Sequence, residues 1–97
     1  GKGKVYNNGN LIYEGEYLDD KKYGKGKGKE YDKGILIFEG EYLNGFRNGI
    51  GKEFYKNGKI KFEGEYLNGE RNGKGKIYNS EGNLVFEDDF LNGKRKK

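Results

Sequence analysis

The chain has 97 residues, of which 31% are hydrophobic and 37% charged, with a formal net charge of +4. A chain of this length forms one small domain or part of a larger array, so a large enzymatic core is not expected. Cys and His are both absent. Their absence excludes disulfides, Ser–His and Cys–His catalysis, and metal or haem sites that need these ligands. We expect no enzyme activity, no cofactor and no metal.

Two further absences bear on location and completeness. No apolar run approaches the roughly 18 residues of a membrane span, and no secretory segment is visible. Together with the missing Cys this predicts a cytoplasmic location, with membrane association as a variant of it. Met is absent as well, which predicts that the chain is a fragment of a longer protein.

The positive charge is concentrated at the C-terminus. Residues 94–97 are all basic and carry the whole excess, because residues 1–93 hold 16 basic and 16 acidic side chains. A second cluster has five lysines with no acid between them: Lys21, Lys22, Lys25, Lys27 and Lys29. A nucleic-acid binder usually has a basic face across the fold, so nucleic acid is a disfavoured partner here. The simplest interpretation of both clusters is solvation.

The sequence repeats every 24 or 25 residues. A motif of the type aromatic-Glu-Gly-Glu-Tyr-Leu begins at Tyr13, Phe38 and Phe62, and a variant of it begins at Phe86. A second marker, Gly-x-Gly-Lys, defines repeat units that start near residues 1, 26, 49 and 73. Residues 1–97 are therefore interpreted as a single array of about four repeats followed by a basic tail, residues 94–97.

Each repeat predicts two strands, because apolar residues alternate rather than recur at helical spacing. The first two hairpins are expected to turn at Asn8-Gly9 and Lys33-Gly34, and the later two through three-residue loops that end in Gly58 and Gly82. With these loops Phe54 lies on the same face as Phe62, and its counterparts Tyr31 and Tyr78 lie on that face with Phe38 and Phe86. The pairs predicted on the other face are Val5 with Ile12, Glu53 with Lys61, and Ile77 with Val85.

Three mid-strand glycines, Gly15, Gly40 and Gly64, each lie between two aromatic residues. Because glycine is unfavourable in a strand, we infer that neighbouring rings stack over these positions; the alternative is that the glycines mark bends. Asn-Gly pairs between repeats indicate tight turns. The predicted fold class is all-β, an elongated single-layer antiparallel meander of about four β-hairpins. Its unpaired edges favour self-association.

The pattern resembles the MORN repeat, the "membrane occupation and recognition nexus" module. In the third copy its aromatic and glycine positions fall on Phe62, Gly64, Tyr66, Gly69, Gly73, Gly75 and Gly82. The first copy has a connection two residues longer. In the last copy Asp88 replaces the mid-strand glycine, which indicates either a cap or the truncation of a longer array. The lysine-rich hairpins are also similar to a bacterial, antitoxin-like variant of the repeat.

The resemblance implies a non-catalytic scaffold for protein assembly, dimerisation or membrane attachment. The paired carboxylates Glu39 and Glu41, and Glu63 and Glu65, lie on one strand face and are interpreted as a solvated Lys/Glu ladder. A glycosidase instead needs two carboxylates across a cleft.

Two binding modes follow. In the first, the chain binds a protein partner or a second copy of itself through exposed rings on one face of the sheet. The candidates are Tyr17, Tyr42, Tyr66 and Phe90, and the alternative is that these rings form the core. In the second, the chain binds anionic phospholipid membranes. The residues predicted for lipid binding are Lys21, Lys22, Lys25, Lys27, Lys29, Arg47, Arg71, Lys94, Arg95, Lys96 and Lys97.

Overall fold

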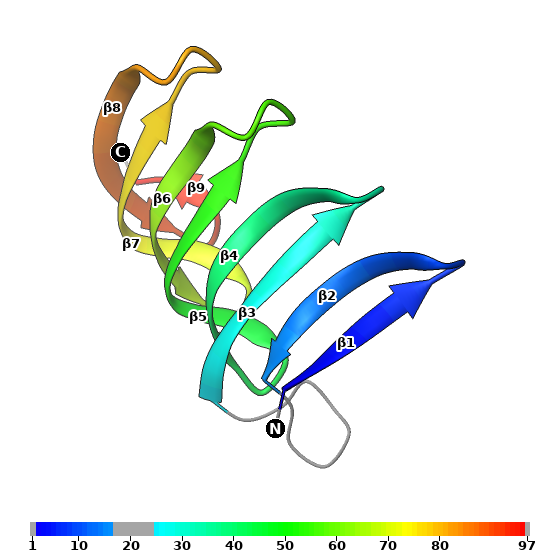
Figure 1. The fold of residues 1–97 in the computed structure, drawn as a ribbon. Coiled ribbons are helices and arrows are strands. Elements are labelled where there is room, and N and C mark those ends of the chain that lie inside the picture. Colours follow the sequence, from blue (N-terminus) through cyan, green and yellow to red (C-terminus); the bar gives the residue numbers. More distant parts are fainter. Residues whose placement is uncertain (1, 17–24, 97) are drawn as a thin grey trace.

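The computed structural model describes residues 2–16 and 25–96, with only the backbone of Lys25 included. Their strands form one nine-stranded antiparallel sheet in which each strand pairs with the next along the chain (Figure 1). The strands are β1 Lys2–Asn7, β2 Asn10–Glu16, β3 Lys25–Asp32, β4 Ile35–Leu43, β5 Phe46–Phe54, β6 Ile60–Leu67, β7 Glu70–Tyr78, β8 Leu84–Leu91 and β9 Lys94–Arg95. The predicted single-layer meander is thus confirmed. Lys94 and Arg95, assigned above to a tail, belong to the sheet.

The hairpin turns follow the predicted chemistry. Asn8 and Gly9 have φ angles of 52° and 81°, and Lys33 and Gly34 have 51° and 82°, as a two-residue type I′ loop requires. The β5–β6 hairpin closes through a bond from the Tyr55 amide to the Lys59 carbonyl. It therefore has a three-residue loop.

Next to the turns the register follows from the predicted loops, with Tyr6 opposite Leu11 and Phe54 opposite Ile60, but one residue further along the strand the three predicted pairs are wrong. Val5 pairs with Tyr13 instead of Ile12, Glu53 with Phe62 instead of Lys61, and Ile77 with Phe86 instead of Val85. The cause is a β-bulge in each hairpin, which sets two residues of one strand opposite one of the other. Equal residue counts on the two strands, assumed above, missed this extra residue.

The bulges also move an aromatic row to the other face. Tyr31 and Tyr78 were expected beside the core rings, with Phe54. Instead, the hydroxyl of Tyr31 donates to Glu14 and that of Tyr78 donates to Glu63, each at 3.2 Å. Both acceptors belong to the charged face described below, so this part of the prediction was wrong.

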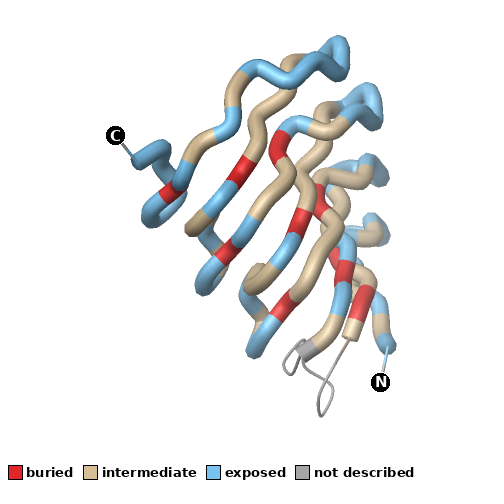
Figure 2. Tube along the Cα trace, turned by 90° about the vertical axis from the view of Figure 1, so that its left-hand side faces the viewer, coloured by how far each residue is buried: buried red, intermediate tan, exposed pale blue. Residues whose placement is uncertain are grey.

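The core is a ladder of six buried aromatic rings on one face of the sheet. Figure 2 shows the buried positions, in red, as a band across the strands. The rings make five consecutive edge-to-face contacts, with centroid distances of 5.1–5.7 Å and interplanar angles of 83–88°, a favoured geometry for aromatic pairs. In order along the ladder they are Tyr13, Tyr42, Phe38, Tyr66, Phe62 and Phe90. Single-layer burial is possible because each ring covers its neighbour.

A row of glycines crosses the sheet beneath these rings. Seven glycines pair in succession from β1 to β7, and the row ends at Asp88 on β8: Gly3, Gly15, Gly28, Gly40, Gly51, Gly64 and Gly75. A Cβ atom on Gly51 would lie 2.5 Å from Phe38 Cζ and 3.0 Å from Tyr66 Cε1. The predicted stacking of rings over glycine is therefore confirmed.

Candidate binding surface

The face opposite the rings carries a charge ladder in strict alternation. Neighbouring strands place Lys and Glu opposite each other across the whole sheet, in the order Lys4, Glu14, Lys29, Glu39, Lys52, Glu63, Lys76 and Glu87. Opposite charges on directly paired positions favour this register. The interpretation of these carboxylates as a Lys/Glu ladder is confirmed.

A second charged row lies two residues further along each strand, towards the turns that join the repeats. Its members are Lys2, Glu16, Lys27, Glu41, Ile50, Glu65, Lys74 and Asp89. Alternation fails at one position, where Ile50 occupies the place of a lysine. The carboxylates of Glu41 and Glu65 accept hydrogen bonds from the backbone amides of Ile50 and Lys74, at 2.7 and 2.8 Å.

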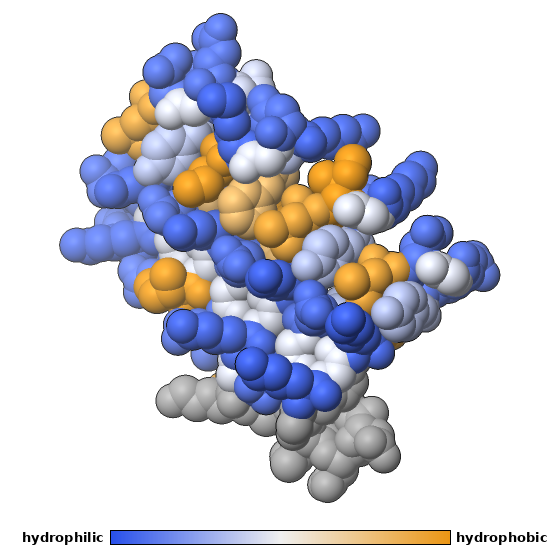
Figure 3. Space-filling model, in the orientation of Figure 1, coloured by the Kyte–Doolittle hydropathy of each residue, from blue (hydrophilic) through white to orange (hydrophobic). Residues whose placement is uncertain are grey.

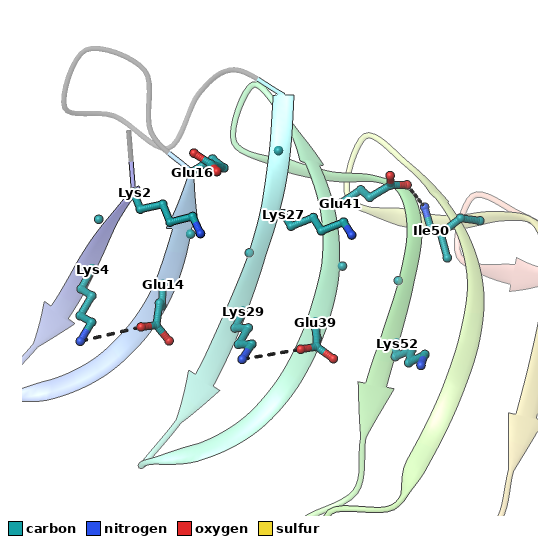
Figure 4. A pocket seen from close by; sticks show the side chains of 16 residues that line it. Lys2, Lys4, Glu14, Glu16, Lys27, Lys29, Glu39, Glu41, Ile50 and Lys52 are labelled. Carbon is teal, nitrogen blue, oxygen red and sulfur yellow. Dashed lines mark hydrogen bonds and ion pairs between the residues drawn. The ribbon is translucent and has the colours of Figure 1, made fainter.

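Between the two rows runs an open groove of about 1190 Å³, with glycine backbone as its floor (Figure 4). Figure 4 shows the charged side chains of β1–β5 on both sides of the glycine positions. We call this face the channel face.

Ion pairs across the channel face are weak. Lys4–Glu14, Lys29–Glu39 and Lys52–Glu63 have N···O distances of 3.7–3.8 Å and side chains 34–54% exposed. Exposed pairs of this kind contribute about 0–1 kcal/mol each. Their charged groups can therefore be exchanged for those of a partner at little cost.

Apolar side chains are also exposed on this molecule. Figure 3 shows apolar side chains between charged ones on one side of the molecule. Among the exposed apolar residues, Phe46, Ile50 and Leu67 lie on β5 and β6 and are each 50–57% exposed. Apolar surface gathered on neighbouring strands is typical of a contact surface.

The two inter-repeat arginines have intramolecular partners. Arg71 makes a bidentate pair with Glu53, with N···O distances of 2.8 and 2.9 Å, and its guanidinium lies 4.3 Å from the centroid of Phe62. Arg47 pairs in the same way with Glu30 and covers Phe38 at 4.1 Å. These guanidinium groups serve as lids on the core rings.

A tyrosine completes each of these ion pairs. Tyr66 donates to Glu53 at 2.6 Å, and Tyr42 donates to Glu30. Burial raises the pKa of Tyr66 well above its ordinary value, and the hydrogen bond to Glu53 adds to the effect. Burial alone would raise the pKa of Glu53, but the hydrogen bonds from Arg71 and Tyr66 hold it below its ordinary value. Glu53 is therefore an ionised acceptor at neutral pH.

The candidate contact rings lie in the core. Tyr42, Tyr66 and Phe90 are each only 4% exposed, which supports the alternative that these rings hold the fold together. Tyr17 lies outside the described residues.

The candidate lipid-binding residues are dispersed. Lys27 and Lys29 lie in the two rows of the channel face, while Lys94 and Arg95 form β9. Arg95 pairs with Asp88 at 2.9 Å and covers Phe86 at 3.6 Å, and Lys96 follows it as an exposed residue. Lys21, Lys22, Lys97 and the side chain of Lys25 lie outside the described part of the chain.

Comparison with known families matches the glycine and aromatic pattern that builds this ladder. The MORN repeat matches residues 13–29 and 62–84, and the MORN repeat variant matches residues 47–68. The chain belongs to the MORN repeat family. MORN repeats occur in proteins that interact with other proteins or with membranes, and the family is non-catalytic. A search of curated proteins finds no match, and the similarity to an antitoxin-like variant is not confirmed.

Two kinds of feature are absent from the described part of this MORN array. Among residues 2–16 and 25–96, no helix has the length and apolar character to cross a bilayer. In the same residues, no cluster of three or more acidic side chains has a geometry suited to a metal ion.

The apolar residues of the channel face were missed from the sequence. Ile50 departs from lysine at the same position of the other MORN repeats, and Phe46 departs from Glu70 and Lys94. Aligning the repeats with one another, and looking for positions at which one repeat differs from the others, identifies Ile50 and Phe46.

Proposed function

We propose that this MORN array is a non-catalytic scaffold that binds another protein, or a second copy of itself, through the channel face. The observation that supports this proposal is the exposure of Phe46 and Ile50 on that face, at 57% and 56%. In a small, highly charged chain, large apolar side chains that are exposed in the isolated molecule mark a surface that a partner covers in the complex. The proposal includes a cytoplasmic location.

The physical character of the face fits this role. Aromatic and aliphatic anchors surrounded by charged residues are the usual anatomy of a protein interface. The weak ion pairs of the ladder are also exchangeable for those of a partner. A catalytic role has no comparable support, because each carboxylate of the first charged row faces a lysine on the neighbouring strand.

Photo-crosslinking tests the proposal. A photoreactive phenylalanine analogue is introduced at Lys52, on the channel face, and in a separate variant at Lys33, in an exposed hairpin turn. We expect protein adducts from a lysate of the source cells at position 52 and not at position 33. Equal labelling at both positions, or none at either, contradicts the proposal.

A second candidate function is peripheral binding to anionic membranes. It is favoured by one observation at the C-terminal end of the sheet, where Leu91 is 51% exposed and lies opposite Lys94 on β9. An exposed apolar residue beside cations suits the interface of an anionic bilayer. The vesicle experiment in the Discussion tests this alternative.

A further inference from the structure

We infer that strand β5 carries a docking site, centred on Ile50, for a segment of a partner protein in which an apolar side chain is flanked by Lys or Arg. The inference rests on the proposed protein-binding function and names the chemistry of the segment that is bound. Its evidence is a comparison among the repeats, the geometry of β5, and the local charge.

Internal comparison singles out β5. The position between the two glycines of Gly-x-Gly-Lys is Lys2, Lys27 and Lys74 in three repeats, and Ile50 in the fourth. Four residues earlier on the same strand, Phe46 stands where β7 has Glu70 and β9 has Lys94. Both departures replace a charged residue with a large apolar one, which is the opposite of what solubility favours at an exposed site.

The two departures share one face. Ile50 pairs with Glu65 of the second charged row and so lies on the channel face. Arg47 pairs with the buried Tyr42 on the ring face, and the next pair, Leu43 with Phe46, therefore points to the opposite face. On the next strand, Leu67 is 50% exposed. Tyr66 pairs with Gly49 and the Asn68 amide donates to Asn48 Oδ1, so Leu67 lies beside the segment that joins Phe46 to Ile50.

The fold does not explain these apolar residues. None of Phe46, Ile50 and Leu67 belongs to the buried core or to the partly buried residues that pack against it. More than half of the Ile50 surface remains in water, so the lysine found at the equivalent positions would serve the sheet equally well. The exposed apolar surface is therefore free for a ligand.

Charge around Ile50 indicates what that ligand carries. With a lysine at position 50, Glu16, Glu41 and Glu65 would each lie between two lysines of the second row, but Glu41 and Glu65 each have Ile50 on one side. The row therefore holds three lysines and four acids, a net charge of −1, within a chain of net charge +4. Strands β4 and β6 lie about 10 Å apart across β5, so the two carboxylates flank Ile50 on either side.

Each of these carboxylates keeps binding capacity. One oxygen of Glu41 and one of Glu65 accept a backbone amide, and an ionised carboxylate has about four acceptor sites in total. A segment that places an apolar side chain on Ile50 and a cation on each side replaces the missing lysine. The site lacks a positive charge. An anionic lipid surface is negative, so it does not supply the missing charge and is repelled by Glu41 and Glu65.

Fluorescence anisotropy with defined peptides tests the inference. The probes are three labelled 14-residue peptides built from Leu and Lys, from Ser and Lys, and from Leu and Glu; phosphatidylserine vesicles form a separate arm. We expect binding of the Leu/Lys peptide alone. Ile50→Lys, which makes β5 match the other repeats, is expected to weaken this binding at least tenfold, and Glu41→Gln with Glu65→Gln at least threefold.

A transplant provides the matched control. Glu70→Phe with Lys74→Ile copies the site onto β7, between Glu65 and Asp89, and is expected to raise the stoichiometry from one peptide to two. Circular dichroism melting verifies that every variant is folded. Equal binding of the Ser/Lys peptide, no binding of the Leu/Lys peptide, or an unaffected Ile50→Lys variant overturns the inference. So does vesicle binding that Ile50→Lys abolishes. If one of these outcomes overturns the docking site on β5, crosslinking at Lys52 still supports the proposed protein binding by the channel face.

Discussion

The substitution Gly51→Ala tests whether the glycine row is what allows the rings to be buried. An alanine Cβ at this position would lie 2.5 Å from Phe38 Cζ, 2.7 Å from Phe38 Cε1 and 3.0 Å from Tyr66 Cε1. Phe38 is fully buried, so its ring has no space to retreat into without moving the next ring of the ladder.

The magnitude follows from two opposing effects. Overpacking a core costs about 1–3 kcal/mol, and because two rings are displaced here we take the upper part of that range, about 2–3 kcal/mol. Replacing glycine also reduces the entropy of the unfolded chain, which offsets about 0.4–1 kcal/mol. The net loss is about 1–2.5 kcal/mol, and at about 4–8 °C per kcal/mol for a chain of this size the melting temperature falls by about 4–20 °C.

Thermal denaturation followed by circular dichroism measures this loss, and the same substitution in a Phe38→Leu background is its control. A leucine at position 38 lacks the two ring atoms, Cζ and Cε1, that the added Cβ would overlap. The gain in backbone entropy is the same in both backgrounds, so the difference between the two losses isolates the overlap with the Phe38 ring. If Gly51→Ala lowers the melting temperature equally in both backgrounds, the stacking argument is refuted.

Three further predictions concern charge. The hydrogen-bonded Glu53 has a lowered pKa in the folded chain, so its stabilisation is complete above its ordinary pKa of 4.5 and is lost as the pH falls through the lowered value. The melting temperature should therefore drop as the pH falls below the ordinary pKa of 4.5, and Glu53→Gln should melt lower at pH 7 with a smaller further drop in acid; equal pH profiles would contradict this assignment. Lys52→Ala, which removes an exposed ladder pair, should change the free energy of unfolding by less than about 0.5 kcal/mol in urea titrations, and a larger change would show that the ladder has a structural role. In vesicle co-sedimentation at low and high salt, Lys94→Glu with Lys96→Glu should remove any salt-sensitive binding to anionic liposomes; binding that persists would exclude this end of the sheet as the membrane contact.

Strands and turns were predictable because their determinants are local. Asn8-Gly9 needs only its own two residues to favour a type I′ turn, and alternation along β6 identifies a strand without knowledge of its partner. The bulges were not predictable by counting, since the extra residue is defined only by the hydrogen bonds across the hairpin. For this reason Tyr31 and Tyr78 were assigned to the wrong face.

Burial of the rings and pairing of the arginines were harder to foresee because both depend on contacts between repeats. Arg71 lies 18 residues from Glu53 in the sequence, and nothing local distinguishes it from a solvated arginine. Tyr66 similarly reads as an exposed ring on a single-layer sheet until Phe38 and Phe62 are found on either side of it. The curved ladder of edge-to-face contacts, rather than a second layer, excludes water from the core.

Departures from the repeat are of two kinds, and the structure distinguishes them. Ile77 stands on β7 where β3 has Glu30 and β5 has Glu53, so the third inter-repeat arginine, Arg95, has no glutamate in the usual place. Asp88 ends the glycine row and supplies that carboxylate instead, at 2.9 Å, while Arg95 still covers Phe86.

The loss of a glutamate at Ile77 and the gain of a carboxylate at Asp88 compensate for each other within the chain. Together they are a structural feature that closes the last repeat. At Ile50 and Phe46 no such compensation exists. Each leaves apolar surface in water, and Ile50 also leaves Glu41 and Glu65 each with one lysine neighbour fewer. Because nothing within the fold offsets the changes at Phe46 and Ile50, we infer that a bound partner offsets them. This distinction, more than exposure alone, is why we assign the binding role of this MORN array to β5 rather than to its C-terminal end.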